Sequence, residues 1–368
     1  MALPLDELLM RIIEEDASDL HLHSHRPPTM RLHGGLVNMD KDSLAPEDTV
    51  GYMKAITSHQ HQEELAKIGS TDFGFAFKDL ARFRVAVYRQ KGEIAIALRL
   101  IPYKFFSFEY LGLGPKVVEL MSRPRGLFLI TGPTGCGKTT TLATMINYIN
   151  ETMDRHIITI EDPIEYYHQH KKSIISQREL GVDLPDFSEG LRRGLRQDPD
   201  VFLVGEMRDT ETIRAAITAA ETGHLVFATL HTTGASRTVD RIVESFPIEE
   251  QEQIRVMLSA SILAVVSQQL LPRTDKKGRI AIYEIMVATA AIANLIREKK
   301  TYRIVSEIQT GIKHGMKTMD QSLLEAYFRG IITRQVAVDA SYEGEQLEKR
   351  LTSVDQGTSA APPVLKEE

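Results

Sequence analysis

The apolar residues follow different periodicities in different parts of the chain. Residues 5–13 place apolar side chains at the i, i+3, i+4, i+7 and i+8 spacing of an amphipathic helix. Alternating segments follow, and His33-Gly34-Gly35-Leu36 is typical of a tight turn between two of them. The alternation continues through residues 73–77, 83–88 and 94–100, which predicts antiparallel strands with one buried face. We therefore expect residues 1–100 to form a small α+β domain.

A second pattern begins at about residue 109. Apolar residues now form unbroken runs at 127–131, 157–160, 201–204 and 225–230, as in parallel strands that are buried on both faces. Helical patterns separate the runs, for example Leu142, Met145, Ile146 and Ile149. These features predict an α/β domain over residues 109–350 with right-handed crossovers. The chain is expected to become mostly helical from about Glu249 onward.

The remaining segments are predicted to lie outside these two domains. Residues 101–108 contain Pro102, which breaks a strand, and are expected to be a linker. Residues 351–368 are small, polar and proline-containing, and we expect them to be a disordered tail.

Composition excludes several classes of protein. The 368 residues include 44 Lys and Arg against 50 Asp and Glu, a net charge of −6, which argues against binding nucleic acid through bulk charge. One Cys cannot build a disulfide framework or a four-thiolate site. The most apolar long stretch, residues 280–296, contains Glu284 and is shorter than the roughly 20 residues of a membrane span. The N-terminus has no basic stretch typical of a secretory signal, so we expect a cytoplasmic protein that meets membranes only through partners.

One segment carries a complete phosphate-binding motif. Residues 132–139 match G-x-x-x-x-G-K-[ST], after an apolar run and before a helical pattern. Backbone N–H groups of such a loop surround phosphates, Lys138 reaches the β- and γ-phosphates, and Thr139 binds Mg²⁺. The motif predicts ATP and Mg²⁺ as cofactors, and Cys136 is expected to be a small filler within it. The candidate nucleotide-binding residues of the loop are Gly132, Pro133, Thr134, Gly135, Cys136, Gly137, Lys138, Thr139 and Thr140.

Charged residues follow three of the predicted strands. The run at 201–204 leads to Glu206, which could bind Mg²⁺ or polarise water, or could merely cap the next helix. Acids at Glu161, Asp162 and Glu165 follow the run at 157–160, which is a weak signal by itself. His224 and His231 flank the run at 225–230, so one of them could contact a γ-phosphate.

Basic residues of the N-terminal domain leave two interpretations open. Arg82, Arg84 and Arg99 lie on neighbouring predicted strands and could stabilise charge on a transferred phosphoryl group, or could form a solvated sheet face. His21, His23 and His25 recur with the spacing of two that places side chains on one face of a strand. A metal site there is disfavoured because no carboxylate or Cys completes the ligand set.

Four motifs in order resemble one family. The segments GPTGCGKTT, ITIEDPIEY, RQDPDVFLVGEMRD and ETGHLVFATLHT are similar to those of the secretion-superfamily ATPases that drive type IV pili and type II secretion. SDLHLHSHRPPTMRLHGGL and IQTGIKHGMKTMDQSL further resemble the PilT-type retraction ATPases of that superfamily. The resemblance covers residues 1 to about 350. It implies a PAS-like N-terminal domain, a RecA-like P-loop ATPase domain and a homohexameric ring.

The resemblance also assigns roles by position. It implies that Lys138 and Thr139 bind nucleotide and Mg²⁺, and that Glu206 is the catalytic base and a Mg²⁺ neighbour. Arg84 and Arg99 match family arginines that reach phosphate when the two domains close, with Arg82 beside them. Glu161, Asp162, Glu165, His224 and His231 would complete the site.

Two features concern the direction of the motor. Assembly-type relatives carry a four-cysteine zinc insertion, whereas residues 273–279 fill the corresponding place here without Cys, which favours retraction. The family segment A-I-R-x-L-I-R-E reads Ala291-Ile-Ala293-Asn-Leu-Ile-Arg297-Glu298 here, so its first Arg is replaced by Ala293. The expected function is pilus retraction and twitching motility, with an inner-membrane pilus platform protein as partner and no stable nucleic acid. Assembly or secretion, DNA translocation and a non-catalytic scaffold are the alternatives.

Overall fold

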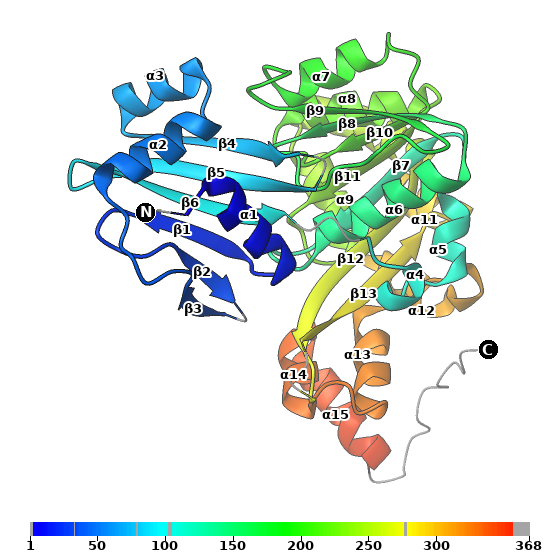
Figure 1. The fold of residues 1–368 in the computed structure, drawn as a ribbon. Coiled ribbons are helices and arrows are strands. Elements are labelled where there is room, and N and C mark those ends of the chain that lie inside the picture. The colour runs from blue at the N-terminus through cyan, green and yellow to red at the C-terminus, as the bar shows by residue number, and fades with distance from the viewer. Residues whose placement is uncertain (1–2, 33, 79, 102–104, 276–277, 356–368) are drawn as a thin grey trace. The chain divides into compact units, whose positions relative to one another are not determined.

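A computed structural model describes residues 3–355 except 33, 79, 102–104 and 276–277. Its contacts divide the chain into two units (Figure 1). The N-terminal unit comprises Met1–Lys104 and Pro163–Tyr167, and the C-terminal unit comprises Phe105–Asp162 and His168–Glu368. Pro102 of the predicted linker lies outside the described residues. Among the residues that the structure does describe, no helix has the length and apolarity that a bilayer crossing requires.

In its described residues, the N-terminal unit is an antiparallel sheet with three helices. The strand order is β3-β2-β1-β6-β5-β4, every neighbouring pair is antiparallel, and the alternation of the sequence is confirmed. On β5, Phe83, Val85 and Val87 are fully buried whereas Arg84 is exposed. The elements are α1 (Leu5–Glu14), β1 (Asp19–His23), β2 (Thr29–Leu32), β3 (Gly35–Asn38), α2 (Pro46–Ile56), α3 (His59–Ile68), β4 (Ser70–Phe77), β5 (Ala81–Gln90) and β6 (Glu93–Ile101).

The C-terminal unit contains a seven-stranded, mostly parallel sheet. The order is β13-β12-β7-β11-β10-β8-β9, and only β13 runs antiparallel to its neighbour. All four predicted apolar runs are strands of this sheet. The strands are β7 (Gly126–Thr131), β8 (His156–Glu161), β9 (Ile174–Glu179), β10 (Val201–Val204), β11 (Leu225–Leu230), β12 (Ile262–Pro272) and β13 (Arg279–Val287).

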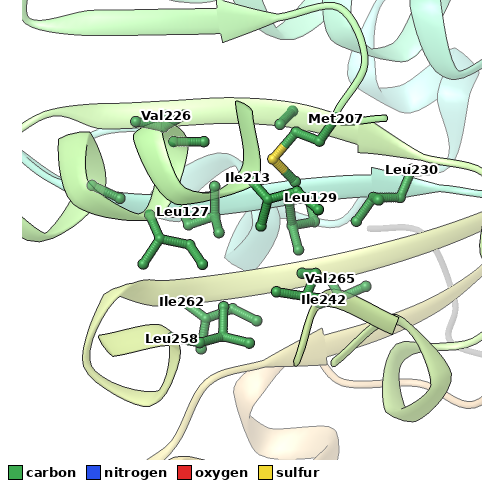
Figure 2. Close-up of a cluster of buried hydrophobic side chains, with 14 of the residues drawn as sticks. Leu127, Leu129, Met207, Ile213, Val226, Leu230, Ile242, Leu258, Ile262 and Val265 are labelled. Carbon is green, nitrogen blue, oxygen red and sulfur yellow. The ribbon is translucent and has the colours of Figure 1, made fainter. Parts of the chain in front are cut away.

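Helices cover both faces of this sheet, which explains the unbroken apolar runs. Leu127 and Leu129 of β7 point into one core with Val226 and Val265, as Figure 2 shows. Phe128 and Ile130 point into the opposite core. The first core is closed by α7 (Phe187–Gly194), α8 (Thr210–Glu221), α9 (Ala235–Glu244), α10 (Ile248–Ser261), α11 (Ala290–Arg297) and α12 (Ile304–Thr310). The second is closed by α4 (Phe108–Leu111), α5 (Pro115–Leu120) and α6 (Lys138–Thr152).

The sequence predictions about the last third of the chain are confirmed in one respect and wrong in another. Helices make up most of the described residues after Glu249, but β12 and β13 form a long antiparallel hairpin there that adds to the sheet beside β7 and that the sequence did not predict. The predicted start of the disordered tail at residue 351 is too early. Helix α15 (Gly344–Asp355) continues through Leu351, which is fully buried. Its side chain packs with α13 (Met319–Phe328), α14 (Arg334–Ala340) and Ile282 in a separate small core. Residues 356–368 of the predicted tail lie outside the described residues.

Candidate functional site

The phosphate-binding motif forms a loop between β7 and α6. The loop leaves β7 after Thr131, and α6 begins at Lys138, so the free N–H groups of the first helical turn face the loop. Gly132, Gly135 and Gly137 all have positive φ, with values of 140°, 77° and 88°. A side chain is excluded at Gly132, because a Cβ there would lie 2.2 Å from the backbone oxygen of Gln268.

Lys138 lies inside this loop with its ammonium group on the loop's own carbonyls. Its Nζ donates to Gly132 O at 2.8 Å and to Pro133 O at 3.1 Å, and the side chain is 9% exposed. The ammonium charge, the free backbone N–H groups and the N-terminal end of α6 together attract anions. The loop therefore suits a phosphate chain, with Thr139 as the hydroxyl that would hold Mg²⁺. That ion, when bound, neutralises charge on the phosphates.

Gln268 of β12 supports the phosphate-binding loop, although no sequence motif indicates this role. Gln268 is 2% exposed, donates from Nε2 to Cys136 O at 2.6 Å, and accepts from Thr141 Oγ1 at 2.8 Å. One buried amide thus joins the loop to the first turns of α6. Cys136 is itself buried, and burial raises the pKa of its thiol, which agrees with a filler rather than a reactive group.

Glu206 lies beside the loop in a charged cluster. Its Oε2 lies 2.7 Å from the guanidinium of Arg208, and its Oε1 lies 2.9 Å from His231 Nε2. The other ring nitrogen of His231 lies 3.5 Å from Thr134 Oγ1 in the loop. His231 therefore connects the candidate base to the phosphate-binding loop. The sheet order explains this, because β11 lies between β7 and β10 and all three strands end at the same edge.

The electrostatics of the cluster keep Glu206 ionised. Burial by itself would raise the pKa of Glu206, but the Arg208 hydrogen bond and the His231 charge outweigh it and hold that pKa below its usual value. The hydrogen bond and charge of Glu206, together with the charge of Asp162, raise the pKa of Arg208. The carboxylate is thus ionised at neutral pH, which a proton acceptor requires.

The acids after β8 divide between the two units. Glu161 ends β8, is 7% exposed, and accepts from Thr159 Oγ1 at 2.6 Å and from Gln177 Nε2 at 3.2 Å. Its partner across the parallel pair is another buried acid, Glu179 on β9. Asp162 follows as an exposed carboxylate whose charge acts on Arg208. Glu165 lies in the Pro163–Tyr167 segment that belongs to the N-terminal unit.

His224 does not join the other candidate residues within this unit. It precedes β11, next to the start of β7, where its backbone oxygen accepts from Gly126 N. Its Nδ1 lies 3.0 Å from Ala219 O at the end of α8, and its ring packs edge-on against Phe202. The six residues of β11 separate His224 from His231, so the two histidines lie at opposite ends of this strand. The expectation that both serve one phosphate site is corrected.

The three candidate arginines all lie in the N-terminal unit. Arg84 and Arg99 are direct partners across the antiparallel β5–β6 pair, and both are exposed. Two like charges side by side disfavour folding unless something offsets them. The charge of Arg99 is offset by the Asp19 carboxylate, which lies 2.9 Å away. The guanidinium of Arg82 lies 5.3 Å from the centre of the Tyr167 ring. The structure thus places Arg84 and Arg99 together on one sheet surface.

The histidines near the N-terminus do not share one face as expected. His21 and His23 lie on β1 with ring centres 6.4 Å apart, but His25 follows the strand at φ 64° and pairs with Glu93 at 3.0 Å. Within the described ranges, no group of three or more His, Cys, Asp or Glu is arranged to hold a metal ion.

Comparison with known proteins identifies the family. Residues 2–339 match the model for the type II/IV secretion system protein family. The chain belongs to that family. It is 46% identical over 333 residues to the type IV pilus retraction ATPase PilT of Pseudomonas aeruginosa, covering 90% of this chain and 96% of that protein. It is 48% identical over 321 residues to a twitching motility protein of Neisseria gonorrhoeae, covering 87% and 86%.

A solved structure supports the same relationship. The fold is similar to a crystal structure of the pilus retraction motor PilT with bound ADP, with a TM-score of 0.88 and 46% identity. The match covers 94% of this chain and 99% of that one. The expected α/β architecture of a secretion ATPase, with an N-terminal domain before the ATPase domain, is confirmed.

Proposed function

We propose that this protein is a motor ATPase that couples ATP hydrolysis to type IV pilus retraction and twitching motility. The observation that carries the proposal is the connection from the phosphate-binding loop through His231 to Glu206. It supplies a phosphate site and a proton acceptor at one sheet edge, which are the two requirements of nucleotide hydrolysis. The relatives named as a retraction ATPase and a twitching motility protein support pilus retraction as the work performed.

Each residue of the cluster has a role in this proposal. Lys138 and the loop N–H groups bind the phosphates, Thr139 holds Mg²⁺, and Glu206 accepts the proton of the attacking water. His231 holds Glu206 toward the loop. Arg84 and Arg99 supply positive charge to phosphate when the domains close in a ring of six copies. We further propose that the ring acts at the cytoplasmic face of the inner membrane, on a platform protein at the pilus base.

Hydrolysis is tested with the purified full-length chain. Lys138→Ala should abolish nucleotide binding. Glu206→Gln should keep nucleotide binding but lower turnover by about 10²–10⁴-fold, the usual contribution of a general base. Wild-type turnover in the Glu206→Gln protein would remove Glu206 as the base. Stimulation of turnover by DNA would favour a translocase over a pilus motor.

The direction of the motor is tested in the host. Deleting the gene should leave cells with many pili and no twitching, and Lys138→Ala at the native locus should reproduce that phenotype. Cells without pili would instead indicate an assembly ATPase. This experiment separates pilus retraction from the assembly and secretion functions of the wider family.

A further inference from the structure

The Glu206 carboxylate is engaged on both of its oxygens. Oε1 lies 2.9 Å from His231 Nε2 and Oε2 lies 2.7 Å from the Arg208 guanidinium. Only 19% of the Glu206 side chain is exposed, so solvent has little other access to it. A carboxylate that takes a proton from water needs an oxygen that can accept the water's hydrogen. Each oxygen keeps a second acceptor site, but a cationic partner makes the carboxylate a weaker proton acceptor, so moving one partner away would make Glu206 a stronger base.

The two partners differ in how firmly they are held. His231 is held on its far side by the phosphate-binding loop, through Thr134 Oγ1 at 3.5 Å. The Arg208 side chain is 65% exposed and extends from the loop between β10 and α8. Solvent reaches the Arg208 end of this ion pair and screens it, which lowers the cost of breaking the pair. Arg208 is therefore the partner that can leave at low energetic cost.

A second carboxylate is available to receive Arg208. Asp162 is exposed at the end of β8, the strand next to β10, and its charge acts on the Arg208 guanidinium. The charges of two acids that follow neighbouring strands therefore both act on Arg208. Moving to Asp162 would preserve an ion pair for Arg208 while releasing one oxygen of Glu206.

We propose that Arg208 is a positioning residue that restrains Glu206, and that its transfer to Asp162 frees Oε2 to accept the proton of the attacking water. This inference rests on the proposed ATP hydrolysis and adds a point of regulation to that site. Arg208 acts through Glu206. The chemical step is unchanged, since the water proton passes to Glu206 and the oxygen attacks the γ-phosphorus while ADP leaves.

The first test removes the restraint. Arg208→Ala should raise the kcat of basal ATP hydrolysis about two- to fivefold, the factor that corresponds to losing a solvent-screened ion pair, with KM unchanged. Arg208→Gln should act in the same direction and serves as a second variant of similar size. Arg208→Lys keeps a cation that reaches Glu206 and should restore the wild-type kcat. A role limited to folding would change the thermal midpoint without this pattern.

A matched control is present elsewhere in the chain. Arg273 forms an ion pair with Asp275, two residues away, at 2.9 Å, which repeats the sequence spacing of Glu206 and Arg208. Arg273→Ala should leave kcat unchanged. Asp162→Asn should lower kcat, because Arg208 then has no second acid to receive it. The Arg208→Ala, Asp162→Asn double variant should hydrolyse as fast as Arg208→Ala.

The outcomes separate this inference from the proposed function. If Lys138→Ala and Glu206→Gln abolish turnover but Arg208→Ala hydrolyses at or below the wild-type rate, the restraint is refuted and ATP hydrolysis stands. A kcat loss by Asp162→Asn that persists in the double variant would refute the transfer to Asp162. If the Lys138 and Glu206 variants retain turnover, the proposed function itself fails.

Discussion

Gln268 is the residue through which β12 shapes the nucleotide site. Its amide donates to Cys136 O at 2.6 Å and accepts from Thr141 Oγ1 at 2.8 Å, with the side chain 2% exposed. We expect Gln268→Met, which preserves size but removes both hydrogen bonds, to destabilise the protein and to weaken nucleotide binding. Each buried hydrogen bond contributes about 1 kcal/mol, and leaving its partner unsatisfied costs about 1–3 kcal/mol.

These magnitudes set the expected affinity loss. The bond to Cys136 is the one that fixes the phosphate-binding loop itself. Losing about 1.4 kcal/mol of loop organisation corresponds to roughly tenfold weaker nucleotide binding. The assay is titration of the purified chain with a fluorescent ADP analogue, together with a thermal melt followed by circular dichroism.

The adjacent residue provides the control. Gln269 Nε2 donates to Ala340 O at 2.9 Å, and successive side chains of a strand point to opposite faces. Gln269→Met should therefore lower the thermal midpoint without changing nucleotide affinity. A Gln268→Met protein that binds the analogue as tightly as wild type would refute the role assigned to Gln268. Thr141→Val combined with Gln268→Met should cost less stability than the two single changes summed, because the two side chains share one bond.

Two further predictions concern buried groups of the same unit. Gly132→Ala should abolish nucleotide binding in the same titration, because its Cβ would meet the Gln268 backbone oxygen at 2.2 Å; retained affinity would contradict the close approach. Burial raises the pKa of Glu284, whose carboxylate accepts from Ala235 N at 2.7 Å, so the folded chain binds that proton more tightly than the unfolded chain. Its contribution to stability should decline as the pH rises through the ordinary and then the raised pKa, and thermal melts across pH should show a steeper fall for wild type than for Glu284→Gln.

The sequence predicted strands best where burial made the pattern simple. Strands β10 and β11 coincide with their predicted runs, because both faces of each strand are covered and every position except Thr229 is apolar. Strand β9 was missed because its pattern is mostly polar and only Ile175 and Glu179 are buried. The β12–β13 hairpin was missed because an apolar stretch that includes Glu284 is also compatible with helix. Glu284 is accommodated only through tertiary contacts that the local sequence does not reveal.

The same distinction applies to the site. A contiguous motif identified the phosphate-binding loop, and an acid after an apolar run identified Glu206. The role of Gln268 could not be predicted, because its side chain contacts Cys136 only once β12 pairs with β7. Arg208 lies two residues from Glu206, yet nothing in the sequence indicates that the two side chains meet. His224 was wrongly grouped with His231 because sequence proximity does not show which edge of a sheet a residue occupies.

The order of strands in the second sheet has a consequence for biosynthesis. In the N-terminal unit only β1 and β6 pair across a long stretch of sequence, and all six strands of its sheet lie before residue 102, so the sheet can form soon after these residues leave the ribosome. Strand β7 cannot pair until both of its neighbours, β11 and β12, have been synthesised. Gln268 is synthesised 132 residues after Cys136. At about 5–20 residues per second, that interval is roughly 7–26 s. The nascent phosphate-binding loop thus lacks its hydrogen bond from Gln268 during this interval. We therefore expect nucleotide to assist folding only after β12 has been synthesised.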